Sequence, residues 1–107
     1  MTIKDFNKLV ETQCERIKAT LTMKQSEYNF SGDRFDSFKK AALLENTTPE
    51  RVLEGYLTKH IISLYDMLNS EEKFSKERWE EKLGDSINYL VLLRGLLEDD
   101  NMFKENK

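Results

Sequence analysis

The segment 75–97 constrains the fold most, because from Tyr89 onward its residues are apolar nearly all the way round a helix. Its apolar side chains recur at spacings that place them on one helical face: Trp79, Leu83, Leu90, Leu93 and Leu97. Ser75 is a suitable N-cap, and Glu77 puts negative charge near the positive end of the helix. A helix that is apolar on several sides has to be covered by other helices. The segment therefore predicts a bundle built around it.

The first part of the chain predicts another long helix, over residues 3–25, with Thr2 as its cap. Its apolar side chains follow at steps of three or four: Phe6, Val10, Cys14, Ile17 and Leu21. Cys14 is the only cysteine of the sequence, so it cannot form a disulfide within the chain. Its place in the apolar stripe predicts a small core residue.

Two further helices are predicted in the middle of the chain. Residues 27–33 contain Asn, Ser and Gly and are expected to form a loop, after which Asp33 caps a helix over residues 34–45. Thr48 followed by proline is a strong start for a third helix, which ends near residue 68. No stretch alternates with period two, so strands are not expected. The fold class predicted is all-α, a bundle of four helices.

The length of 107 residues fits one domain, assigned here to residues 1–98, with a polar C-terminal tail at 99–107. The apolar surface of the two long helices is too wide for a monomer of this size to bury. We therefore expect a homo-oligomer.

Charge and hydropathy exclude several function classes. The net charge of −3 gives no electrostatic basis for binding nucleic acid, so none is expected as a partner. No apolar run approaches a membrane span, and no signal peptide is visible, so no membrane is expected and a cytoplasmic location is predicted.

The acids of the last helix are the first candidates for chemistry. Asp85 and Asn88 share a face that becomes apolar within one turn, where a carboxylate needs a cation, hydrogen-bond donors or a metal. Glu81 lies one turn before Asp85, and both could share a Mg²⁺ ion, which prefers oxygen ligands from more than one element. Asp66, near the end of the third helix, could add a further carboxylate ligand. Alternatively, Glu81 belongs to a solvated face.

The third helix places His60 within its apolar face and Lys59 beside it. His60 is either a core or interface histidine with its hydrogen bonds satisfied or a group that orients a ligand. Lys59 could neutralise Asp66 or hold a phosphate, and the sequence leaves both alternatives open.

A third group of candidates surrounds the first loop: Lys24, Tyr28 and Arg34, with phenylalanines between them. Aromatic rings against a base and cations against phosphates could bind a nucleotide. Equally, the aromatic rings could close the end of the bundle.

Three motifs in order give the chain a family resemblance. These are K-x-x-E-Y-x-x-x-x-D-R-F-x-x-F from Lys24, the pair Lys59-His60, and D-x-x-N-Y from Asp85 to Tyr89. Together they resemble the phage and prophage proteins of the nucleotide modification associated domain type. More distantly, the chain is similar to the MazG-like all-α nucleotide pyrophosphohydrolases.

The resemblance implies an oligomeric helical protein in which acids on adjacent helices bind Mg²⁺, and water cleaves a nucleoside triphosphate to release pyrophosphate. By position, Asp85 would be a metal ligand and Asn88 and Tyr89 would support it. Lys24 and Lys59 would meet phosphates.

The sequence departs from the MazG pattern in its acids, because Lys82 stands three residues before Asp85, where a carboxylate belongs. Two functions therefore stay open. One is a Mg²⁺-dependent (deoxy)nucleoside triphosphate pyrophosphohydrolase with Asp85 and Glu81 as its catalytic acids. The other is a non-catalytic phage-type module that sequesters a nucleotide or inhibits a host protein in an anti-defence role. A third, simpler alternative is a helical oligomer in which Asp85 pairs with Lys24 or Lys59.

Overall fold

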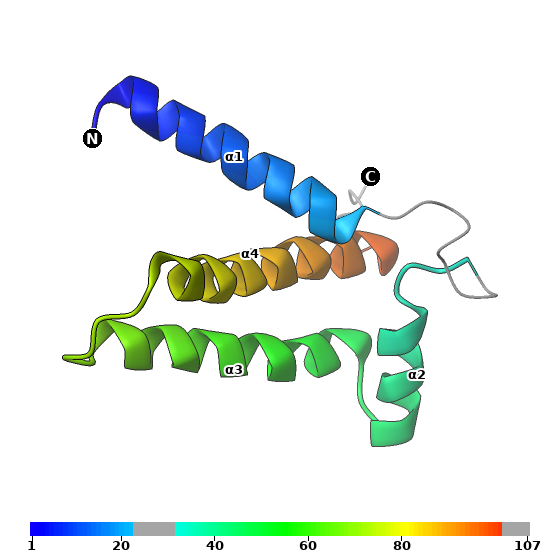
Figure 1. Cartoon of the computed structure of the whole chain (residues 1–107). Helices are drawn as coiled ribbons and strands as arrows, with labels where there is room; N and C mark the ends of the chain where they lie inside the picture. Colours follow the sequence, from blue (N-terminus) through cyan, green and yellow to red (C-terminus); the bar gives the residue numbers. More distant parts are fainter. Residues whose placement is uncertain (23–31, 102–107) are drawn as a thin grey trace.

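The structure, a computed structural model, describes residues 1–22 and 32–101 and is built from helices (Figure 1). Their bounds are α1 (Ile3–Leu21), α2 (Asp36–Glu45), α3 (Pro49–Leu68) and α4 (Lys76–Asp99). No strand occurs among the residues described. The predicted all-α class is confirmed. None of the described helices is both long and apolar enough to cross a bilayer.

Three helix starts follow the predicted capping chemistry. The hydroxyls of Thr2, Thr48 and Ser75 each accept a hydrogen bond from the backbone amide three residues further on, at 3.0, 3.3 and 3.1 Å. Pro49 occupies the first turn of α3, where its missing N–H costs nothing. These starts are set by local chemistry, which is why the sequence predicts them.

Other boundaries differ from the prediction. Helix α1 ends at Leu21 rather than at residue 25, and the predicted loop at 27–33 lies mostly outside the described residues. Asp33 is not the N-cap of α2, which is Phe35. Instead, the Asp33 carboxylate accepts a hydrogen bond from the Phe35 amide at 2.9 Å, so a turn precedes the helix.

Helices α3 and α4 lie side by side as an antiparallel pair, and α2 crosses the N-terminal end of α3 (Figure 1). The buried apolar side chains of the described residues come from α2, α3 and α4: Ala42, Val52, Leu53, Met67 and Leu96. Leu53 is fully buried, and Leu96 is 1% exposed. The core therefore lies along the α3–α4 pair and extends to α2 at the N-terminal end of α3.

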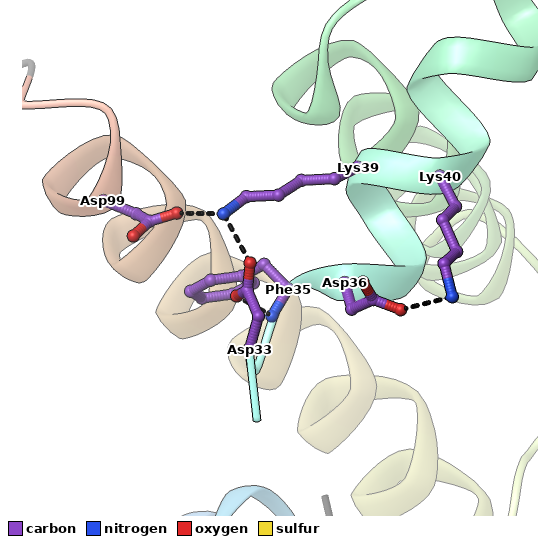
Figure 2. Close-up of polar contacts among 6 residues, drawn as sticks. All are labelled: Asp33, Phe35, Asp36, Lys39, Lys40 and Asp99. Carbon is purple, nitrogen blue, oxygen red and sulfur yellow. Dashed lines mark hydrogen bonds and ion pairs between the residues drawn. The ribbon is translucent and has the colours of Figure 1, made fainter. Parts of the chain in front are cut away.

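A charged cluster joins the start of α2 to the end of α4 (Figure 2). Lys39 Nζ lies 2.6 Å from Asp33 Oδ2 and 2.8 Å from Asp99 Oδ2. The hydrogen bond from Lys39 holds the pKa of Asp33 below its ordinary value, and the two carboxylates hold the pKa of Lys39 above its own.

Helix α1 packs on α4 alone among the described helices and contributes no buried residue. Cys14 is exposed, so its prediction as a core residue is wrong. The physical reason is that α4 covers only one side of α1. The apolar stripe that contains Cys14 extends beyond that side.

Candidate functional site

A row of aromatic rings crosses from α2 over α3 to α4. Tyr56 stacks on Tyr89, with ring centroids 6.0 Å apart and planes within 9°. His60 lies against Tyr89 with a centroid separation of 5.1 Å. Phe38 meets Tyr56 edge-on at 6.4 Å. We call these four side chains the aromatic row.

The row exists because of helical spacing on two antiparallel helices. Tyr56 and His60 stand one turn apart on α3, and Asp85 and Tyr89 stand one turn apart on α4. His60 Nδ1 lies 3.7 Å from Asp85 Oδ2, slightly beyond hydrogen-bonding distance. The structure thus brings three predicted site residues, His60, Asp85 and Tyr89, to one place.

The site opens to solvent at the row. Tyr56 is 46% exposed, and the Asp85 side chain is 42% exposed, whereas the His60 side chain is only 24% exposed. A ligand can therefore reach one tyrosine ring and one carboxylate, with the imidazole partly sheltered between them.

Asn88, one turn along α4 from Asp85, has a buried Oδ1 atom that meets no hydrogen-bond donor among residues 1–22 and 32–101. A buried acceptor without a donor costs free energy, and such atoms in folded chains call for an explanation. The prediction that Asn88 supports Asp85 is compatible with this position, since both lie on the same side of α4.

A shallow hollow of about 270 Å³ is lined in part by Tyr56. Lys59 and Arg51 bring two cations to its lining, next to Glu45. Arg51 also pairs with Glu54, at 3.1 Å. Sequence reasoning missed Tyr56 and Arg51. The available signal was spacing, because Tyr56 precedes His60 by one turn on the same helix face.

The remaining predicted residues are not gathered at this place. Glu81 and Asp66 are exposed, and neither forms a hydrogen bond or ion pair with Asp85 within the described part of the chain. Arg34 is half-buried in the turn before α2. Lys24 and Tyr28 lie outside the described residues.

The donor set at Asp85 does not fit Mg²⁺ by itself. Within residues 1–22 and 32–101, no three acidic, histidine or cysteine side chains come together to hold a metal ion. Mg²⁺ demands several oxygen ligands in octahedral geometry, whereas Asp85 has an imidazole as its neighbour. The magnesium site stays a prediction.

Comparisons with protein-family models, with curated proteins and with solved structures give no match for this chain. The resemblance to the nucleotide modification associated domain and MazG-like proteins therefore depends on the three sequence motifs alone.

Proposed function

We propose that this chain is a MazG-like nucleotide-handling protein that binds a nucleoside triphosphate at the aromatic row. One observation carries the proposal: a half-exposed stacked tyrosine, Tyr56, stands directly beside a hollow lined by Lys59 and Arg51. A base can pack against the exposed part of the Tyr56 side chain, since every base has a π-face. The phosphates then lie toward the two cations.

His60 and Asp85 would complete the site at the other end of the row. The Asp85 carboxylate accepts hydrogen bonds and can receive one from a sugar hydroxyl. It also lies 3.7 Å from the His60 ring nitrogen Nδ1, so a ligand at this end of the row can meet both side chains. In this proposal Asp85 and His60 recognise the nucleoside, and Lys59 and Arg51 recognise the phosphates.

Binding without hydrolysis is the form that the described residues favour, because Asp85 lies beside His60 and no group of three potential metal ligands occurs among the described residues. The second candidate is the Mg²⁺-dependent pyrophosphohydrolase implied by the family resemblance. It requires further carboxylates beside Asp85.

Equilibrium binding of the eight common ribo- and deoxynucleoside triphosphates tests the first proposal. Stacking of a base on an aromatic side chain contributes about 1–3 kcal/mol, so Tyr56→Leu should weaken binding roughly 5- to 150-fold. Tyr65→Leu is the matched control, because Tyr65 lies on the same helix and is 63% exposed, away from the row. Equal affinity of Tyr56→Leu and the wild type would reject the row as the binding site.

Pyrophosphate release from the same nucleotides, with Mg²⁺ or Mn²⁺, separates the two candidates. Turnover that disappears in Asp85→Asn would establish the hydrolase. Binding without turnover would leave the non-catalytic module. Absence of both binding and turnover in the folded protein would contradict the proposed function.

A further inference from the structure

Helix α2 forms one side of the hollow at the aromatic row. Its Phe38 ring meets Tyr56 edge-on, and Glu45 at its end lines the hollow beside Tyr56. The same site takes Asp85 and Tyr89 from α4, yet no Cα atom of α2 lies within 8 Å of a Cα atom of α4. The direct connection between these two helices is therefore made by side chains.

One lysine makes this connection (Figure 2). Lys39 Nζ lies 2.6 Å from Oδ2 of Asp33, in the turn before α2, and 2.8 Å from Oδ2 of Asp99, at the end of α4. The other carboxylate oxygen of Asp33 accepts a hydrogen bond from the Phe35 N–H at 2.9 Å. We call Asp33, Lys39 and Asp99 the Lys39 clasp. The clasp ties the last turn of α4 to the first turn of α2.

Aromatic rings continue from the clasp to the row. The Phe35 ring lies against α4 at Gly95, where a Cβ atom would stand 2.7 Å from Phe35 Cζ. The centroid of this ring is 6.4 Å from that of Phe38, and the Phe38 centroid is 6.4 Å from that of Tyr56. Phe38 also directly precedes Lys39 in α2. A shift of α2 that opens the clasp therefore moves Phe38 relative to Tyr56, because packed side chains move together.

The neighbouring lysine forms an ordinary surface ion pair in the same helix. Lys40 Nζ lies 2.9 Å from Oδ2 of Asp36, one turn earlier in α2, and the Lys40 side chain is 73% exposed. Since this pair stays within one helix, it cannot hold α2 against α4. Lys39 is 39% exposed and bridges two carboxylates from separate segments. The two lysines carry the same charge and differ in what they connect.

We propose that the Lys39 clasp holds Phe38 and the α2 side of the hollow in the position that binds the nucleotide. Lys39 is then a positioning residue, which acts through α2 and makes no contact with the ligand. This role rests on the proposed function, nucleotide binding at the aromatic row. When the clasp is open, α2 occupies the binding position in only a fraction of the molecules, and the apparent affinity falls by that fraction. The free energy that the two ion pairs contribute sets the upper limit of the effect.

The dissociation constant of the nucleoside triphosphate that the wild type binds most tightly tests this role. Lys39→Met should raise it about 2- to 30-fold, the range expected for two partly exposed ion pairs. Lys40→Met removes the same charge at the next position and should leave it unchanged. Asp99→Asn should also raise it, because the clasp loses its contact with α4. The double variant Lys39→Met with Asp99→Asn should bind no more weakly than Lys39→Met alone, since both changes open the same clasp.

A proton NOE between the rings of Phe38 and Tyr56, measured without nucleotide, reports the position of α2 independently of binding. It should weaken in Lys39→Met and stay the same in Lys40→Met. An unchanged NOE in Lys39→Met, or unchanged affinity in both Lys39→Met and Asp99→Asn, would overturn the positioning role while nucleotide binding at the row stands. A wild type that binds none of the nucleotides would instead overturn the proposed function and, with it, the role of the clasp in binding.

Discussion

Replacing Gly95 by alanine should destabilise the protein, although alanine is the better helix former. A Cβ atom at Gly95 would lie 2.7 Å from Phe35 Cζ and 3.3 Å from Phe35 Cε2. Movement of the ring is restricted, because the Phe35 N–H donates a hydrogen bond to the Asp33 carboxylate and the ring lies 6.4 Å from that of Phe38. Figure 2 shows Phe35 lying beside the α4 ribbon.

Gly84 provides the matched control, because it lies in the same helix and a Cβ there would meet nothing within 4 Å. Glycine to alanine within a helix contributes about 0.5–1 kcal/mol of stability, so Gly84→Ala should stabilise the chain by that amount. Overpacking costs about 1–3 kcal/mol. Gly95→Ala should therefore be less stable than Gly84→Ala by about 1–3 kcal/mol, the helix-propensity gain being common to both.

Urea unfolding followed by circular dichroism measures this difference, at one protomer concentration because association adds to stability. The double variant Gly95→Ala with Phe35→Leu should recover part of the loss, since the shorter side chain vacates the space. If Gly95→Ala stabilises the protein as much as Gly84→Ala does, then Phe35 does not pack on α4, and the position of the turn before α2 is wrong.

Two further predictions concern stability. In urea unfolding, Leu53→Ala should lower the free energy of unfolding by about 2–5 kcal/mol because Leu53 is fully buried, whereas Leu44→Ala should change it by no more than about 0.5 kcal/mol. Equal losses in the two variants would contradict the assigned core. Interaction with Asp100, and then burial, raise the pKa of Glu50 above its ordinary value of 4.5. The folded chain then binds this proton more tightly than the unfolded chain, so stability falls as pH rises from 4.5 through the raised pKa. Glu50→Gln should therefore raise Tm at pH 7 and lose that advantage below pH 4.5 in thermal melts. The same Tm difference at both pH values would contradict the raised pKa of Glu50.

The sequence predicted those parts of the fold that depend on neighbouring residues. Three N-caps were correct because a hydroxyl three residues before an amide is a local arrangement. The assignment of Asp33 as a cap failed because the same side chain can also close a turn, and the hydrogen bond to Phe35 selects the turn.

The candidate site was predicted only in part, because periodicity shows which residues share a helix face but not what that face meets. His60, Asp85 and Tyr89 were each selected from their own helix, and their meeting depends on how α3 is rotated against α4. The exposure of Cys14 has the same origin, since a stripe on α1 does not reveal whether one helix or two will cover it.

His60 allows the most direct test of nucleotide binding at the aromatic row, because it is the only histidine in the sequence and gives a single imidazole Hε1 signal by NMR. Titration with each of the eight nucleoside triphosphates should move that signal to saturation for at least one of them. The midpoint of the titration should be unchanged in Tyr65→Leu and should lie at a roughly 5- to 150-fold higher nucleotide concentration in Tyr56→Leu. An imidazole signal that stays unmoved by all eight at millimolar concentration would contradict the proposed site.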